Sequence, residues 1–174
     1  MTTTAHLPET PDASAVPAPQ GRLAIDYWTV VMGEDASCAS CDATLTDLNG
    51  AVDAVRPLAE RLGITLEVVP RTVSTWEQAL EHQITASPTL RSAGLELSPS
   101  HPDDSETRLW SWRGRTSGSL PQEAVLDLVL RAVAARSAQL GDYLARGGPS
   151  PYIRRFLSTP VTAEPEPDDS CGCP

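Results

Sequence analysis

The chain of 174 residues contains no lysine, and each of its 13 basic residues is an arginine. It carries 23 acidic residues and a formal net charge of −10. Binding to nucleic-acid phosphates or to anionic membrane surfaces requires a basic face. The composition therefore predicts no nucleic-acid partner and no membrane partner.

Long apolar runs are also lacking. No stretch approaches the roughly 18–20 apolar residues that a membrane-spanning helix needs. Residues 1–20 have neither the basic region nor the apolar region of a secretory signal. We therefore expect a cytoplasmic protein. Structural disulfides are rare in that reducing compartment, so the four cysteines predict redox or metal sites instead.

Large apolar side chains are scarce at both ends of the chain. Residues 1–20 and 159–174 cannot bury enough apolar surface to offset the entropy of ordering, so we expect disordered N- and C-terminal tails. The C-terminal tail is acidic, rich in proline, and contains Cys171-Gly172-Cys173. One folded domain is predicted between the tails, over residues 21–158.

Strand and helix patterns alternate within that domain. The periodicity of apolar residues predicts a βαβαββα order and an α/β domain of two or three layers. Pro57 should kink or divide the first helix, and Ser74 is the expected N-cap of the second. The predicted strands are 22–31, 64–71, 87–97 and 107–113, and the predicted helices are 42–62, 75–81 and 121–145, with a last helical turn at 152–157.

The motif that carries chemistry is Cys38-Ala39-Ser40-Cys41, directly after the first predicted strand and directly before the first predicted helix. A helix N-terminus offers unpaired N–H groups and a partial positive charge, and both favour a thiolate. Two sulfurs at this spacing can close a disulfide or chelate one thiophilic ion. In thiol–disulfide exchange, Cys38 would be the attacking thiol and Cys41 the resolving thiol.

A second motif, Ser87-Pro88-Thr89, begins the third predicted strand. Together with the CxxC motif it makes the chain resemble the thioredoxin superfamily. The resemblance implies a thioredoxin-like βαβαββα domain with a central mixed four-stranded sheet. It also implies that Pro88 is a cis-proline packed against the start of the CxxC helix, and that Ser87 and Pro88 dock the substrate.

The resemblance can be narrowed to one family within the superfamily. Tyr27-Trp28, Ser87-Pro88-Thr89-Leu90-Arg91, the CxxC and the later cysteines are similar to an uncharacterised prokaryotic thioredoxin-like family, over residues 22–136. Ala39-Ser40 replaces the Gly-Pro of thioredoxin, and Ala36-Ser37 stands where a tryptophan usually precedes the first cysteine. The resemblance implies a thiol–disulfide protein that needs no cofactor and acts on a protein or small-molecule thiol or disulfide. Activity as a thiol–disulfide oxidoreductase would follow from this role. The resemblance does not extend to the potential or substrates of thioredoxin.

The C-terminal Cys171 and Cys173 leave an alternative open. A CxC pair can bind soft metals or metalloids such as Cu(I), Hg(II), Zn(II) or arsenite. With Cys38 and Cys41 it would form a tetrahedral site of four thiolates, and the same tail could instead exchange with the CxxC. The alternative function is therefore a thiophilic metal-binding protein. A third hypothesis is a thioredoxin-like scaffold used for protein interaction alone.

The remaining chemically active side chains show weaker patterns. His6, His82 and His101 lack ligand spacing to any cysteine, so we expect them to be solvated. Trp110 and Trp112 fall on one face of a predicted strand, where packing is the expected role and a substrate groove the alternative.

Overall fold

The computed structural model describes residues 21–31, 39–105 and 107–157. Contacts divide the chain into two compact units, with the division between Ala138 and Gln139. The described part of the first unit contains six strands, the first two helices and most of the third helix. The described part of the second unit contains the end of the third helix and a fourth, short helix. No helix in the described ranges is both long and apolar enough to span a membrane.

The main sheet has four strands in the order β2-β1-β3-β4. β1 runs parallel to β2, with Gly21 opposite Ile64, and antiparallel to β3, with Trp28 opposite Thr89. β3 and β4 are antiparallel. The predicted α/β class with a mixed four-stranded sheet is therefore confirmed. The strand bounds are Gly21–Val30 for β1, Ile64–Val73 for β2, Thr89–Ser92 for β3 and Leu95–Leu97 for β4.

The fourth strand of this sheet is not the one that the sequence predicted. Residues 110–112 (β5) pair instead with residues 115–117 (β6) in a separate two-stranded sheet. The chain reverses directly after β3 because Ala93 and Gly94 both have positive φ, at 50° and 78°. Two such residues form the tight hairpin turn that matches strand twist. β4 has only three residues, too few for a recognisable alternation.

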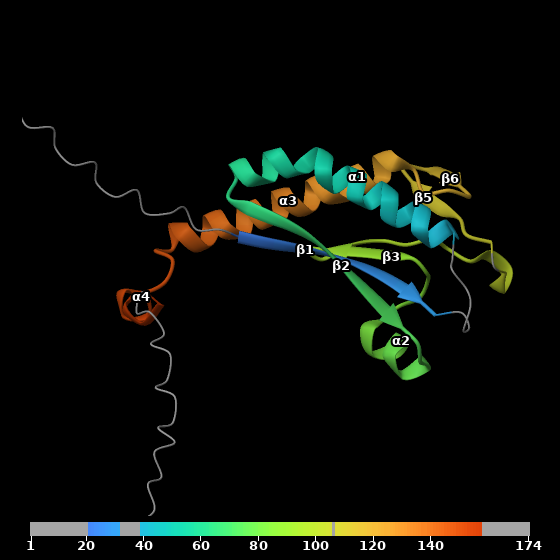
Figure 1. Ribbon diagram of the computed structural model, residues 1–174, viewed down its shortest axis with the longest axis horizontal. Helices are drawn as coiled ribbons and strands as arrows, with labels where there is room; N and C mark the ends of the chain where they lie inside the picture. The colour runs from blue at the N-terminus through green and yellow to red at the C-terminus, as the bar shows by residue number, and fades with distance from the viewer. Residues whose placement is uncertain (1–20, 32–38, 106, 158–174) are drawn as a thin grey trace, which may run out of the picture. The chain divides into compact units, whose positions relative to one another are not determined.

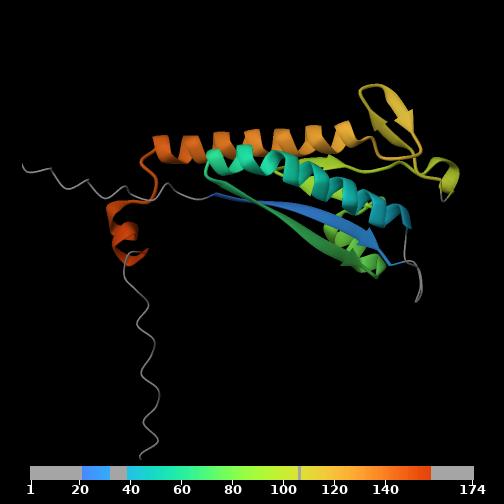
Figure 2. The same cartoon turned by 45° about the horizontal axis from the view of Figure 1, so that its top comes forward.

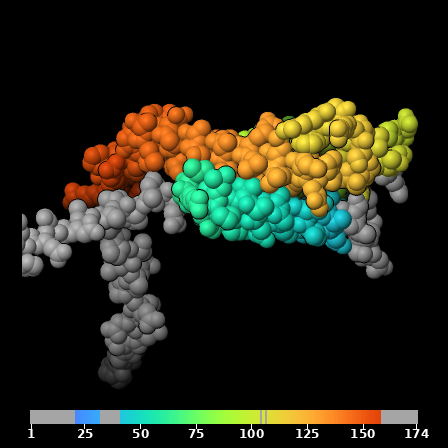
Figure 3. All heavy atoms as spheres, turned by 90° about the horizontal axis from the view of Figure 1, so that it is seen from above, coloured from blue at the N-terminus to red at the C-terminus, as the bar shows by residue number. Residues whose placement is uncertain are grey.

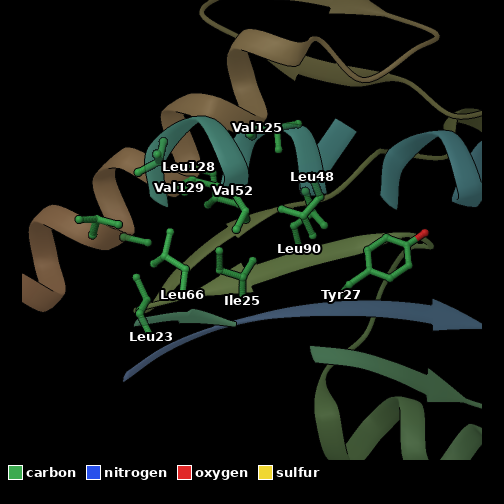
Figure 4. Packing of buried hydrophobic residues seen from close by; sticks show 14 of the residues in the cluster. Leu23, Ile25, Tyr27, Leu48, Val52, Leu66, Leu90, Val125, Leu128 and Val129 are labelled. Atoms are coloured by element: carbon green, nitrogen blue, oxygen red, sulfur yellow. The ribbon is translucent and has the colours of Figure 1, made fainter. Parts of the chain in front are cut away.

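One face of the main sheet is covered by α1 (Ala39–Arg61) and α3 (Gln122–Ala145). The two helices lie side by side over the sheet (Figures 2 and 3). Alternate side chains of β1 point toward them, as the period of two in a strand requires. Figure 4 shows this layer of the core, which includes Leu23, Ile25 and Tyr27 of β1, Leu48 and Val52 of α1, and Val125, Leu128 and Val129 of α3.

The opposite face of the sheet is covered locally by α2 (Trp76–His82), near the ends of β1 and β2 (Figure 1). A second, smaller apolar cluster fills this layer. It contains Trp28 of β1, Val73 of β2 and Ile84, with Val30 and Ala79 packed against them. Trp28 is therefore on the face of β1 opposite Tyr27, and the sheet is apolar on both sides at this end.

α1 is a single helix that continues through Pro57. Of the two predicted effects of Pro57, division of the helix is therefore wrong, and a kink stays a prediction. A proline in a helix leaves the carbonyl four residues earlier without its N–H partner. Here that residue is Asp53, and both Pro57 and Asp53 are exposed, so solvent can replace the lost hydrogen bond.

The N-cap of α2 is Thr75 and not the predicted Ser74. The Thr75 hydroxyl accepts a hydrogen bond from the Gln78 N–H at 3.3 Å. The Gln78 side-chain oxygen in turn accepts one from the Ser74 N–H at 2.9 Å. Both residues take part in the cap, and the sequence could not distinguish two adjacent hydroxyl residues.

Arg91 of β3 joins the sheet to the end of α2. Its guanidinium donates to the carbonyl oxygens of His82 and Gln83, the latter at 2.6 Å, and forms an ion pair with Glu96 at 2.7 Å. The Arg91 side chain is only 25% exposed. Three charge-assisted hydrogen bonds from one largely covered side chain therefore join β3 to the end of α2 and to β4.

We therefore expect Arg91→Ala to lower the free energy of unfolding by about 2 kcal/mol, as for hydrogen bonds that involve a charged group. The matched control is Arg22→Ala, which removes a strand ion pair with Glu67 at a side chain that is 77% exposed. The control should lose less than about 1 kcal/mol. Urea unfolding of both variants measures the difference, and equal losses would contradict this role of Arg91.

The second unit contains the predicted last helical turn. α4 spans Pro151–Leu157, which confirms that prediction. It follows a turn in which Gly147 and Gly148 both have positive φ. The Arg154 guanidinium donates to the carbonyl oxygens of Pro149 and Gly147, each at 2.8 Å, and so holds the turn against the helix.

Candidate functional site

The candidate site lies at one edge of the main sheet. β1 and β2 are parallel, so their C-terminal ends meet at this edge. The chain enters α1 there, and α2 lies beside the end of β2 (Figure 1). β3 is antiparallel to β1, so it begins at the same edge. Residues that follow β1 and precede β3 are therefore brought together, although they are distant in sequence.

Cys41 lies in the first turn of α1 and is 8% exposed. It belongs to the core cluster between the sheet and the two long helices. Its backbone carbonyl accepts a buried hydrogen bond of 2.6 Å from the Tyr27 hydroxyl. Tyr27 is itself 4% exposed. This bond fixes the first turn of α1 above the end of β1.

Ser87 and Pro88 form the turn that leads into β3. The peptide bond between them is cis, as predicted, whereas the packing of Pro88 against the start of α1 stays a prediction. Ser87 is 3% exposed, and its hydroxyl oxygen accepts a hydrogen bond of 3.1 Å from the Val30 N–H. Pro88 is fully buried. The Thr89 hydroxyl donates to the Ala86 carbonyl at 2.8 Å and closes the turn.

The structure thus ties the turns that hold three of the predicted site residues, Cys41, Ser87 and Pro88, to the C-terminal end of β1. β1 contacts the Cys41 turn through Tyr27 and contacts Ser87 through Val30, only three residues further along the same strand. Pro88 follows Ser87 directly. The other predicted residues, which are Cys38, Cys171 and Cys173, lie outside the described residues.

A cluster around Trp28 was not predicted from the sequence. The rings of Trp28 and His82 lie 4.7 Å apart, centroid to centroid. The Arg71 guanidinium lies 5.5 Å from the centre of the Trp28 ring and forms an ion pair of 2.6 Å with Asp26. His82 is exposed, as expected, but its ring covers Trp28 instead of standing alone in solvent.

This cluster lies next to the site because Trp28 is opposite Thr89, the residue after Pro88. It leaves Trp28 only 8% exposed. In the part of the chain that the structure describes, the Trp28 indole N–H has no hydrogen-bond partner. No short-range pattern could have found the cluster, because its members come from β1, β2 and the last turn of α2.

The tryptophans of β5 have a structural role. Trp110 is 2% exposed and belongs to the main core, and Trp112 packs against that core. The Arg113 guanidinium lies 4.5 Å from the centre of the Trp112 ring. The prediction that this pair packs is confirmed. The alternative, a substrate groove lined by both rings, is wrong for Trp110 because its side chain is buried.

Within the described ranges, no group of three or more His, Cys, Asp or Glu side chains is close enough to hold a metal ion. Comparison of the chain with protein-family models, with curated proteins and with solved structures found no match. Function is therefore inferred from the residues at the edge of the sheet.

Proposed function

We propose that the protein carries out thiol–disulfide exchange through Cys38 and Cys41 on a thioredoxin-like domain. The observation that carries this proposal is that β1 contacts both the Cys41 turn and Ser87. The element order supports it as well. β1, α1, β2, α2, β3, β4 and α3 follow the βαβαββα order, with the β5–β6 hairpin inserted before α3.

The proposed reaction has two exchange steps. The Cys38 thiolate attacks one sulfur of a substrate disulfide, a mixed disulfide forms, and the other substrate sulfur leaves as a thiolate that takes up a proton. The Cys41 thiolate then attacks the Cys38 sulfur and releases the second substrate thiol. Two electrons pass to the substrate, and the protein is left with a Cys38–Cys41 disulfide.

The environment of Cys41 supports its role as the resolving thiol. Cys41 is only 8% exposed, so a bulky substrate disulfide has little access to it. Cys41 follows Cys38 by three residues in the sequence, a CxxC spacing at which two thiols can close a disulfide. The first turn of a helix also stabilises the thiolate that performs this second attack.

Ser87 and Pro88 are the proposed docking residues. The Ser87 hydroxyl accepts a hydrogen bond from the Val30 N–H, so this turn is held against the end of β1. A turn held in this way at the end of β1 can position a substrate without a large loss of conformational entropy on binding.

A small-molecule disulfide assay tests the proposal. The purified, reduced protein should reduce a model disulfide and release two substrate thiols per chain as Cys38 and Cys41 become oxidised. The Cys171→Ser/Cys173→Ser double variant should keep this rate within about twofold, because the C-terminal pair takes no part in the proposed reaction. Failure of the wild-type protein to reduce the disulfide would contradict the proposal.

The same double variant separates exchange from soft-metal binding, which remains a prediction. A protein that binds metal through four thiolates would take up about one Zn(II) or Cu(I) per chain with thiolate charge-transfer absorbance, and would lose that affinity in the double variant. That result, with no disulfide reduction, would favour the metal-binding alternative.

A further inference from the structure

The outer face of α2 carries large apolar side chains in solvent. Trp76 is 72% exposed and Leu80 is 59% exposed. They are four residues apart, so they lie on the same face of the helix. Ala79 lies on the inner side of α2 and packs against the smaller apolar cluster. Trp76 and Leu80 therefore do not contribute to the core.

This face lies at the edge of the sheet that holds the candidate site. α2 begins three residues after Val73, the last residue of β2. Val31, which follows β1 and is 51% exposed, donates its N–H to the Val73 carbonyl at 3.0 Å. Trp76 and Leu80 form a surface that we call the α2 patch, and Val31 and Val73 lie at the end of the sheet from which the chain enters α2. Val31 follows Val30, whose N–H donates to the Ser87 hydroxyl.

The α2 patch has an acidic border. Glu77 and Glu81 lie on α2 beside Trp76 and Leu80, and both are exposed. Among residues 21–31, 39–105 and 107–157, neither carboxylate forms an ion pair. The nearby Arg71 is already paired with Asp26. Two uncompensated negative charges therefore flank the apolar side chains.

We propose that the α2 patch docks a positively charged, apolar segment of a protein substrate whose disulfide is presented to Cys38. The inference rests on the proposed function and names its substrate class. Exposed tryptophan is typical of binding surfaces, where it buries a large area at a low entropic cost. Charge complementarity with Glu77 and Glu81 would select cationic segments and speed their association. A small-molecule disulfide would need neither feature.

Peptide probes test the selectivity. Two synthetic peptides would each carry a central cysteine in a mixed disulfide with a small thiol, one with flanking leucine and arginine, the other with flanking leucine and glutamate. We expect the wild-type protein to reduce the cationic peptide with a kcat/KM about tenfold higher at low salt, and the ratio to fall as salt is raised. Equal rates for the two peptides would overturn the proposal.

Variants of the α2 patch test which of its residues dock the cationic peptide. Trp76→Ala should lower kcat/KM for the cationic peptide by about tenfold, the typical effect of removing an aromatic anchor. Glu77→Gln/Glu81→Gln should bring the rates for the two peptides close together. Leu62→Ala is the matched control, because Leu62 is an exposed apolar residue at 43% outside the patch and the site. Unchanged selectivity in the two patch variants would contradict docking at this surface.

A binding measurement keeps docking separate from chemistry. A labelled cationic peptide with serine in place of cysteine should bind the wild-type protein in fluorescence anisotropy, and bind Trp76→Ala more weakly. If the peptide binds but no disulfide is reduced, the proposed function is wrong and the docking surface stands. If it does not bind, docking is wrong whatever the rate. A concentration-dependent dimer that Trp76→Ala disrupts would show instead that a second copy occupies the patch.

Discussion

Cys38→Ser is expected to abolish the reduction of a model disulfide, whereas Cys41→Ser is expected to stop after the first exchange and accumulate a mixed disulfide at residue 38. The two variants differ because the two thiols act in different steps of the exchange. Cys38 makes the first attack, and Cys41, buried in the first turn of α1, releases the substrate. Time courses of released thiol, with mass spectrometry of the trapped species, measure both effects.

The tail provides the control for these variants. Cys171→Ser/Cys173→Ser leaves the proposed pair intact and should behave as the wild type does. If Cys41→Ser released substrate as fast as the wild type, resolution would come from another thiol, and the C-terminal pair would be the first candidate. If Cys38→Ser retained activity, the assignment of the attacking thiol would be wrong.

Trp110→Ala should give the largest loss of stability, about 3–5 kcal/mol in the free energy of unfolding. Trp110 is 2% exposed and is one of the largest fully buried side chains of the core. Its removal deletes the apolar contacts that attach the β5–β6 hairpin to the cluster under α1 and α3. The cavity that remains adds to the lost transfer free energy, since the surroundings relax only partly.

Trp76→Ala is the matched control for that experiment. It makes the same change of side chain at a residue that is 72% exposed, so it should alter stability by less than about 0.5 kcal/mol. Guanidinium unfolding of the two variants gives the comparison. A loss at Trp110 as small as that at Trp76 would mean that the hairpin is not part of the cooperative core.

The long elements could be predicted from the sequence. β1 and β2 each have 10 residues, and α1 and α3 have 23 and 24, so several periods of the apolar pattern are present in each. The long crossover from β1 through α1 to β2 also follows from that pattern, because parallel strands need such a connection. α1 was predicted as well, and only its division at Pro57 is wrong, since an exposed proline is tolerated where solvent satisfies the freed carbonyl.

The pairing of the three-residue strands could not be predicted. β4, β5 and β6 have three residues each, and they are placed by the hairpin turns at Ala93-Gly94 and Arg113-Gly114. Neither pair has the Asn-Gly or Asp-Gly sequence that usually indicates such a turn. The fourth strand of the sheet was therefore predicted at residues 107–113, where the alternation of tryptophans is clear but the pairing is with β6.

The candidate site was predicted to the extent that it depends on local motifs. The position of Cys41 at a helix start follows from the local pattern, whereas the cis bond before Pro88 was implied by the resemblance to the thioredoxin superfamily. The bonds that join them, Tyr27 to the Cys41 carbonyl and Val30 to Ser87, are tertiary contacts and could not be predicted. The α2 patch could not be predicted either, because the exposure of Trp76 and Leu80 depends on how α2 packs on the sheet.

The most direct test of the central claim uses the Cys171→Ser/Cys173→Ser variant, in which Cys38 and Cys41 are the remaining cysteines. The reduced variant is treated with one equivalent of a small disulfide, and its peptides are mapped by mass spectrometry without reduction. The account predicts an intramolecular Cys38–Cys41 disulfide and the release of both substrate thiols. Cysteines that stay as thiols, or that end as stable mixed disulfides with the small thiol, would contradict it.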